Sequence, residues 1–207
     1  MSKSREVILL VGTRKGAFVF RSNQDRSEWT LDGPHVAGSP IYCTAFDSRD
    51  NSSVYAASSN DWFGPAVYLS RDQGRTWRQA KSSPKFTAKS GATVKKLWHV
   101  AVGPSARPGE VWAGAEPAAL FRSTDSGDTW RPVNSLNNHA TVSQWQPGGG
   151  GLCLHTIVQD AGDSNRMYVG VSAGGAYRTD NAGRTWRPIN HGVHCDFTPG
   201  PPPEVGA

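Results

Sequence analysis

Two carboxylates, two imidazoles and three indoles stand out as side chains that could act together on a sugar. A carboxylate pair can supply the acid and the base or nucleophile of glycoside hydrolysis, and a histidine can position or transfer a proton. An indole ring offers a flat surface on which a sugar can stack. The candidates are Glu116, Asp61, His155 and His99 for catalysis, and Trp62, Trp98 and Trp145 for stacking. Whether they meet depends on the elements that carry them.

A short phrase repeated along the chain indicates what those elements are. It reads Ser-Arg-Asp-Gln-Gly-Arg-Thr-Trp at 70–77 and Ser-Thr-Asp-Ser-Gly-Asp-Thr-Trp at 123–130. We interpret 178–186 as a third copy with one inserted residue, and 21–29 as a worn copy. The closing tryptophans recur roughly every 50 residues, a period typical of an array of like supersecondary units. We name the phrase the repeat turn, because each copy separates two strand-like runs.

Each repeat turn is expected to be held by its own residues. The aspartate accepts hydrogen bonds from backbone N–H groups of the turn, and the glycine adopts a positive φ. The tryptophan begins the next strand and buries a large surface between neighbouring repeats. Because catalysis would not require the same residue in every repeat, we interpret this set as structural: Asp72, Gly74, Trp77, Asp125, Gly127, Trp130, Asp180, Gly183 and Trp186.

The pattern Ser-x-Asp-x-Gly-x-Thr-Trp resembles the Asp-box of the bacterial neuraminidase (BNR) repeat. Through it the chain resembles the Asp-box β-propellers of the sialidase superfamily. Residues 116–123 and 148–155 carry a closer likeness to the amino-terminal half of bacterial sialidase-like and glycosyl hydrolase-like BNR-repeat proteins. The resemblance implies an all-β partial β-propeller with four-stranded antiparallel blades, whose ring mouth binds a glycan, with glycoside hydrolysis in the complete protein. Sialidases also share an Arg-Ile-Pro stretch, which this sequence does not contain.

Strand-like runs bounded by Gly, Pro, Asp and Asn predict blades at about 7–32, 41–80, 97–134 and 152–190. The first repeat has no counterpart of the innermost strand, and the Pro/Gly-rich tail 191–207 is expected to lead to missing blades. Two interpretations remain open: a truncated propeller, or a homodimer in which two half-rings close on each other. On the first interpretation the fragment alone could be inactive.

Strand order predicts which loops share a face. If strands run from inner to outer, the loops between second and third strands share one face with the starts of the inner strands, and the repeat turns lie on the opposite face. That face would hold a ligand pocket, and it collects Asp61, Trp62, Trp98, His99, Glu116, Trp145 and His155. Two alternatives remain open, because His155 could be a core histidine and Glu116, before Pro117, could brace a turn.

Composition narrows the classes of partner. The sequence has no apolar run long enough for a membrane span, and its three cysteines are widely spaced, as expected of reduced thiols in a cytoplasmic protein. Residues 78–96 contain six Lys or Arg and no acid. With a single aromatic residue among them, this run is interpreted as a solvated loop and not as a nucleic-acid contact. No metal or cofactor is expected. The expected ligand is a carbohydrate, or a protein if the propeller is a non-catalytic scaffold.

Overall fold

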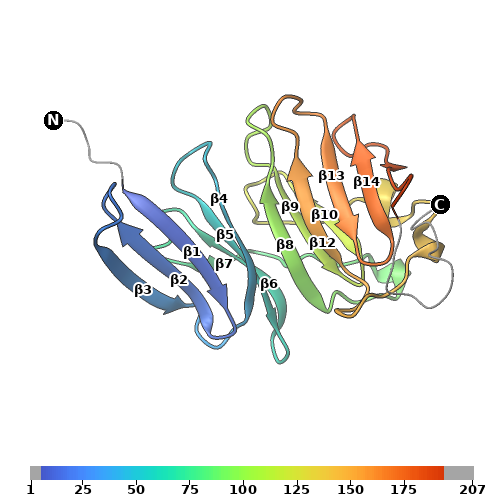
Figure 1. Ribbon diagram of the computed structural model, residues 1–207. Helices are drawn as coiled ribbons and strands as arrows, with labels where there is room; N and C mark the ends of the chain where they lie inside the picture. The colour runs from blue at the N-terminus through green and yellow to red at the C-terminus, as the bar shows by residue number, and fades with distance from the viewer. Residues whose placement is uncertain (1–5, 194–207) are drawn as a thin grey trace.

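The computed structural model describes residues 6–193, which form four antiparallel β-sheets joined by loops (Figure 1). The predicted tail lies outside the described residues from 194 onward. The first sheet contains β1 (Val7–Thr13), β2 (Gly16–Ser22) and β3 (Trp29–His35). The second contains β4 (Ile41–Phe46), β5 (Val54–Asn60), β6 (Gly64–Ser70) and β7 (Arg78–Gln79).

The third and fourth sheets repeat the four-stranded pattern. The third contains β8 (Lys96–Val102), β9 (Val111–Glu116), β10 (Ala119–Ser123) and β11 (Arg131–Pro132). The fourth contains β12 (Leu154–Gln159), β13 (Met167–Val171), β14 (Gly175–Thr179) and β15 (Arg187–Pro188). Short helical turns lie in the loops: η1 (Ala88–Ser90), α1 (Asn134–Asn137) and η2 (Val142–Gln144). None of the helices in residues 6–193 is long and apolar enough to cross a membrane.

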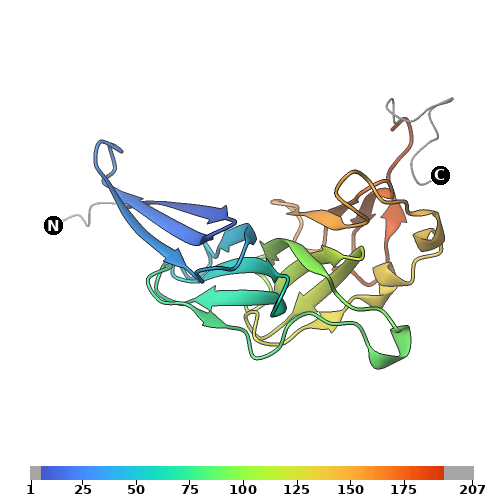
Figure 2. The ribbon, with the colours of Figure 1, turned by 90° about the horizontal axis from the view of Figure 1, so that it is seen from below.

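Within each sheet the strands follow chain order, and the sheets follow one another along an arc, as Figure 2 shows from below. The inner strands β4, β8 and β12 are neighbours, and β1 lies next to β4. The predicted all-β class is confirmed, and so is the three-stranded first sheet.

Hydrophobic side chains fill the space between neighbouring sheets. Trp130 packs with Tyr55 and Leu69 of the second sheet, and Trp186 packs with Trp112 of the third. Both repeat-turn tryptophans are 7% exposed. Trp130 and Trp186 therefore each join their own sheet to the preceding one, although no hydrogen-bonded ladder crosses between the described sheets.

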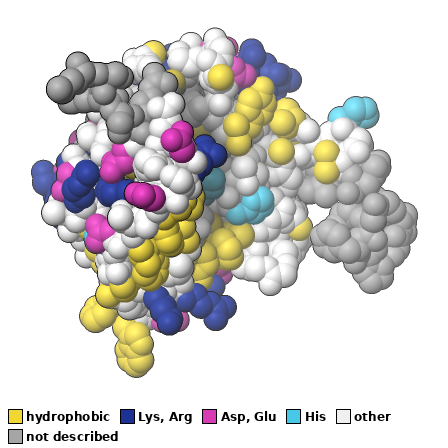
Figure 3. Space-filling view, turned by 60° about the vertical axis from the view of Figure 1, so that its left-hand side comes forward, with side chains coloured by type: hydrophobic (Ala, Val, Ile, Leu, Met, Phe, Trp, Pro, Cys, Tyr) yellow, Lys and Arg dark blue, Asp and Glu magenta, His cyan; other side chains and the backbone are white. Residues whose placement is uncertain are grey.

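The first sheet leaves hydrophobic side chains exposed. Leu9, Trp29 and Leu31 are 50%, 43% and 58% exposed. Figure 3 shows a band of hydrophobic side chains on the side of the molecule where this sheet lies. Its first strand, β1, is an edge strand that pairs with β2.

The repeat turns at 70–77 and 123–130 share one hydrogen-bond pattern. Asp72 Oδ1 accepts from Ser70 Oγ at 2.7 Å and from the Thr76 backbone N–H at 2.9 Å, and its Oδ2 accepts from Thr76 Oγ1 at 2.6 Å. Asp125 makes the same three bonds at 2.8, 2.9 and 2.6 Å. Gly74 and Gly127 follow at φ +84 and +86. The aspartate bonds that close these turns all lie within seven residues of chain, and backbone bonds from Gln73 to Ser52 and from Ser126 to Gly109 tie the turns to the preceding loops.

The third copy corrects our alignment. The predicted inserted residue does not exist, and Asp180 is not the turn residue. Asn181 takes that place, because its Oδ1 accepts from Thr179 Oγ1 at 3.0 Å and from the Thr185 N–H at 2.9 Å. Asp180 instead accepts from Arg166 at 2.8 Å and from Arg178 at 2.6 Å. The turn needs an acceptor oxygen at this position and not a charge, so an amide can replace the carboxylate.

Replacing Asp125 with Ala is expected to lower the free energy of unfolding by about 1–2 kcal/mol, because several turn donors lose their acceptor. Asp125→Asn should lower the free energy of unfolding by less, because Asn181 fills the same position in the last repeat turn. Burial raises the pKa of Asp125, but hydrogen bonds from Thr129 and Ser123 outweigh it and hold the pKa below its usual range. A lowered folded-state pKa stabilises the fold above about pH 4, and this is lost as the pH falls. The difference in free energy of unfolding between the wild type and Asp125→Asn should therefore become smaller at acid pH.

Urea unfolding at pH 7 and pH 3.5 measures both effects. Asp61→Ala is the matched control, since this exposed aspartate makes no side-chain bond among the described residues and its loss should change stability by less than about 0.5 kcal/mol. Equal stabilities of Asp125→Ala and Asp125→Asn would contradict the acceptor role.

Candidate functional site

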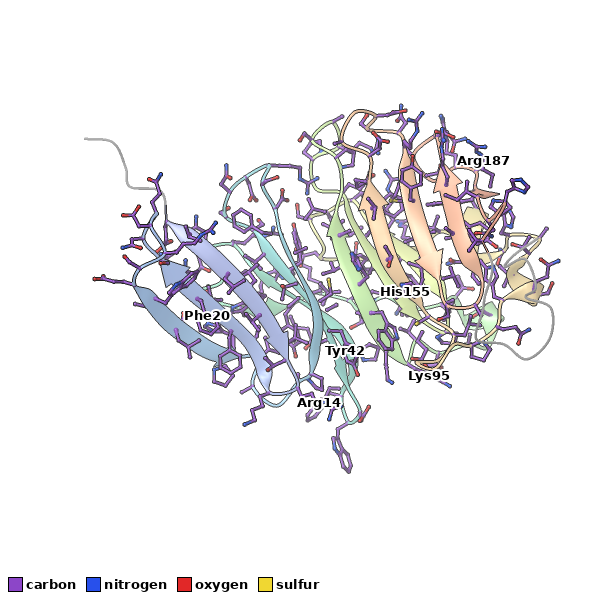
Figure 4. The ribbon with its side chains drawn as sticks, viewed as in Figure 1. Arg14, Phe20, Tyr42, Lys95, His155 and Arg187 are labelled. Atoms are coloured by element: carbon purple, nitrogen blue, oxygen red, sulfur yellow. The ribbon has the colours of Figure 1, made fainter. Side chains whose placement is uncertain are left out.

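One edge of the array carries the candidate residues. We name it the mouth: the hairpins that join second to third strands, the starts of β4, β8 and β12, and the loop 148–151 that precedes β12. Figure 4 shows Arg14 and Tyr42 toward this edge, with Lys95 near it and Arg187 near the opposite one. The repeat turns follow the third strands and lie at that opposite edge, as strand order predicts.

The three complete inner strands each begin with a register irregularity. It lies between Ile41 and Cys43 in β4, between Leu97 and His99 in β8, and between Leu154 and Thr156 in β12. The residues skipped by the pairing are Tyr42, Trp98 and His155. A bulge re-aims a side chain and is common beside binding sites. The sheets thus present three equivalent side chains at the mouth.

The second and third sheets contribute a group that we name the mouth cluster: Tyr42, Lys96, Trp98 and Glu116. The Trp98 indole N–H donates to Glu116 Oε2 at 3.2 Å. Lys96 Nζ lies 3.9 Å from the same oxygen and 5.8 Å from the Trp98 ring centroid. The Tyr42 ring, 43% exposed, meets Trp98 edge-on with centroids 5.1 Å apart. The indole plane is therefore fixed from two sides.

The glycine run before β12 closes over this cluster. A Cβ on Gly151 would lie 2.9 Å from Glu116 Oε1, and one on Gly150 would lie 3.5 Å from the Trp98 ring. Gly151 also has φ +100, which other residues rarely adopt. The run forms a tight bridge between Gly148 and Gly151 and leads into a strand, not a helix. It thus brings backbone of the fourth sheet against Glu116.

The two histidines lie at the mouth without a carboxylate partner among residues 6–193. His99 Nδ1 bonds the backbone oxygen of His155 at 3.1 Å, so Nδ1 carries the proton. Burial lowers the pKa of His99, and the bond to that carbonyl only partly opposes the shift, so the neutral imidazole is favoured. His155 is exposed, and its Nδ1 lies 2.8 Å from Thr156 Oγ1. The core alternative for His155 is therefore wrong.

The predicted stacking tryptophans differ in exposure. Trp145 is 5% exposed and its indole N–H donates to the Tyr177 hydroxyl at 2.7 Å, so its prediction as a sugar platform is wrong. Trp62 is 92% exposed beside Phe63 at 91%, on the β5–β6 hairpin. Trp98 lies between these extremes, half-buried and held in place.

No protein-family profile matches the chain. A "probable oligoxyloglucan-reducing end-specific xyloglucanase" of Neosartorya fischeri is 28% identical over 152 residues, 70% of this chain and 17% of the relative. The GH74 xyloglucanase structure from Xanthomonas campestris covers 89% of this chain with a TM-score of 0.64 and 24% identity. YCF48 from Cyanidioschyzon merolae covers 96% with a TM-score of 0.51 and 14% identity.

These solved structures are β-propellers, and their match extends over all four sheets. The chain is a partial β-propeller. Its sheets are the blades, and it spans 17% of the curated xyloglucanase, 29% of the Xanthomonas enzyme and 59% of YCF48.

The two candidate carboxylates occupy different blades. Glu116 is 17% exposed in its side chain and belongs to the mouth cluster. Asp61 is exposed on the β5–β6 hairpin, and no hydrogen bond or ion pair within the described chain joins it to Glu116. Between residues 6 and 193 no three His, Cys, Asp or Glu side chains are grouped to hold a metal ion. The arrangement places a partly exposed indole and one carboxylate side by side at the mouth.

Sequence reasoning selected Glu116 and Trp98 for this site but missed Lys96. Lys96 was read only as one of six basic residues in the run 78–96, although its place two residues before Trp98 at the start of β8 carries it to the mouth. The glycine run 148–151 lies in the long loop before the fourth blade, and its composition is a sequence signal for the close backbone approach.

Proposed function

We propose that the mouth binds a glycan, with Trp98 as the stacking platform. The observation that carries this proposal is the fixed indole plane, because the Trp98 N–H donates a hydrogen bond to Glu116 and the Tyr42 ring makes a T-shaped contact with the indole. A preformed aromatic surface loses little conformational entropy on binding. Glu116 and Lys96 supply the polar groups that orient sugar hydroxyls.

The proposed ligand class is a xyloglucan-type oligosaccharide, and the proposed activity of the complete protein is its hydrolysis. The name of the Neosartorya fischeri relative supports both. The repeat turns support membership of the Asp-box propellers, but nothing supports a preference for sialic acid, since the sequence lacks the Arg-Ile-Pro stretch. Hydrolysis requires a second carboxylate about 5–10 Å from the first. Turnover of xyloglucan by the complete protein tests this part of the proposal.

Trp98→Ala is expected to weaken xyloglucan-oligosaccharide affinity at least tenfold, about 1.4 kcal/mol or more, because the stacking surface is removed. Isothermal titration on the 207-residue chain measures it. Trp29→Ala is the matched control, since Trp29 is also partly exposed but lies in the outer strand β3 of the first blade. Unchanged affinity of Trp98→Ala would place the glycan elsewhere, and no binding by the wild type would refute the proposal for this chain.

A protein-binding scaffold is the second candidate function. The fully exposed Trp62–Phe63 pair favours it, because such a pair on a projecting hairpin is typical of an interaction site. On this proposal Trp62→Ala abolishes capture of a protein partner, whereas Trp98→Ala does not. If Trp62→Ala and Trp98→Ala both lose glycan binding, and the wild type captures no protein, the result favours the glycan function instead.

A further inference from the structure

A cavity lies between the third and fourth blades at the repeat-turn edge, opposite the mouth. It has a volume of about 280 Å³. Arg122, Thr124 and Arg131 of the third blade line it, and Ala182 and Gly183 of the last repeat turn face them. No Asp or Glu is among the described residues that line this cavity, which we name the turn pocket. The charged part of its lining is therefore entirely basic.

The two arginines of the turn pocket stand directly opposite each other. Arg122 of β10 is paired with Arg131 of β11 in the strand register, and like charges in this position repel. Arg122 Nη2 donates to Glu110, but its Nε is buried with no acceptor among residues 6–193. The Arg131 side chain makes no ion pair or hydrogen bond with any described residue. One of the two guanidinium groups thus has no counter-charge.

The fourth blade contains the same pair of arginines together with a carboxylate that the third blade lacks. Arg178 of β14 is paired with Arg187 of β15, at the repeat-turn edge (Figure 4). The Asp180 carboxylate lies 2.6 Å from Arg178 Nη2 and 3.7 Å from Arg187 Nη2. Asp180 directly follows the last residue of β14, and the residue that directly follows β10 is Thr124. In the third blade a neutral hydroxyl therefore replaces the carboxylate.

A second acid is also replaced at this boundary between blades. In the second blade Arg78 holds the place of Arg131, since each directly follows the tryptophan of its repeat turn. Arg78 binds Asp128 of the next repeat turn through two hydrogen bonds of 2.7 and 3.0 Å. Asp128 stands two residues before the tryptophan of that turn, and in the last repeat turn this place belongs to Arg184. Arg131 thus lacks an acid from its own blade and from the next one.

The two carboxylates nearby are already used by other donors. Glu110 accepts from Arg107 and Trp112 besides Arg122. Asp125 accepts from the hydroxyl and backbone donors of its own repeat turn and does not line the pocket. The Arg131 guanidinium is therefore available to a ligand.

We propose that the turn pocket binds the phosphate group of a small organic phosphate ester, in the place that the Asp180 carboxylate takes in the fourth blade. A guanidinium group matches phosphate oxygens through two parallel hydrogen bonds. The Thr124 hydroxyl and the Asn134 amide also line the pocket and make no side-chain hydrogen bond within the described chain, so both can donate. The cavity is larger than a phosphate group, and Pro132 and Val133 line it with apolar surface for the organic part.

Titrations with inorganic phosphate and phenyl phosphate, at an ionic strength held constant with chloride, test the proposal. We expect saturable binding of both to the 207-residue chain in isothermal titration, with NMR chemical-shift changes concentrated in residues 122–135. Phenyl phosphate should bind about threefold more tightly or better, because its ring adds apolar contact with Pro132 and Val133. Equal affinities would overturn the organic part and leave a site for inorganic phosphate. No saturable binding of either compound would overturn the whole proposal.

Arg131→Gln should weaken phenyl phosphate binding about tenfold or more, because charge-assisted bonds to the phosphate are lost. Arg187→Gln is the matched control, since Arg187 has the same place in the fourth blade but lies beside the Asp180 carboxylate. The affinity of this control should stay close to that of the wild type. An equal loss in both variants would overturn the proposal, because it would show that surface charge alone attracts the anion.

Thr124→Asp supplies the missing carboxylate from the chain itself. In chloride buffer this variant should melt at a higher temperature than the wild type, because the arginine pair gains a counter-charge. It should also lose phenyl phosphate binding, whereas Thr124→Asn, of similar size but without the charge, should keep it. If Thr124→Asp binds phenyl phosphate as the wild type does, the ligand does not lie between the two arginines and the proposal fails.

This site is independent of the proposed glycan function, because it lies at the edge opposite the mouth. Trp98→Ala should bind phenyl phosphate with the affinity of the wild type. A chain that binds phenyl phosphate but no xyloglucan oligosaccharide would refute the proposed function and support the turn pocket. The reverse result would refute the turn pocket alone.

Discussion

Glu110→Gln is expected to lower the free energy of unfolding by about 3–5 kcal/mol, the range for breaking a buried ion pair by removing one partner. Glu110 is 1% exposed. Its Oε1 accepts from Arg107 Nε and from Trp112 Nε1, each at 3.0 Å, and its Oε2 accepts from Arg122. The amide would leave two guanidinium groups facing each other with no negative charge between them.

The Glu110 carboxylate matters because it anchors contacts among three blades. Arg107 also donates to Ser164 of the fourth blade, and Arg49 of the second blade donates to the backbone oxygens of Arg107 and Glu110. Losing the carboxylate therefore loosens the third blade against both neighbours. Urea unfolding at pH 7 measures the change.

The matched control is Glu6→Gln, which removes an exposed carboxylate paired with Arg21. Surface pairs contribute about 0–1 kcal/mol, so this variant should unfold almost as the wild type does. A cost for Glu110→Gln as small as that of Glu6→Gln would show that the network adds little to stability.

The fold was predictable from the sequence because its signals are local. Asp72, Thr76 and Ser70 close their turn within seven residues, so the same phrase marks the same turn wherever it occurs. The spacing of these phrases then predicted the successive sheets. The absence of a strand-like run before Val7 predicted that the first sheet has three strands. The error at Asp180 shows the limit of matching residue types. The turn requires a side-chain oxygen that accepts its backbone N–H bonds, and the amide oxygen of Asn181 meets this requirement.

The candidate site was less predictable because its contacts join distant segments. Nothing near Trp145 in the sequence shows that Tyr177, 32 positions later, binds its indole and buries it. Glu116 was chosen for its loop and Trp98 for its place at the start of an inner strand, but their hydrogen bond depends on the pairing of β8 with β9. The bulges that place Tyr42, Trp98 and His155 at the mouth arise from strand pairing. No residue type in these strands predicts a bulge.

Gly114→Ala is expected to lower the free energy of unfolding by about 3 kcal/mol or more, the upper end of the range for overpacking. Gly114 is buried in β9, and the new Cβ would lie 2.3 Å from the Leu154 carbonyl oxygen and 2.7 Å from Leu154 Cδ2. The obstacle is backbone of the next inner strand, which cannot rotate away as a side chain could. The variant must therefore separate the third and fourth blades at the mouth.

This prediction runs against the intrinsic preference, since alanine in a strand is favoured over glycine by roughly 0.5–1 kcal/mol. Gly149→Ala is the control, because a Cβ there would meet nothing within 4 Å. Chemical unfolding should show that variant unchanged or slightly stabilised. If Gly114→Ala were equally tolerated, the close approach of β9 to β12 could not be what fixes the spacing of the third and fourth blades.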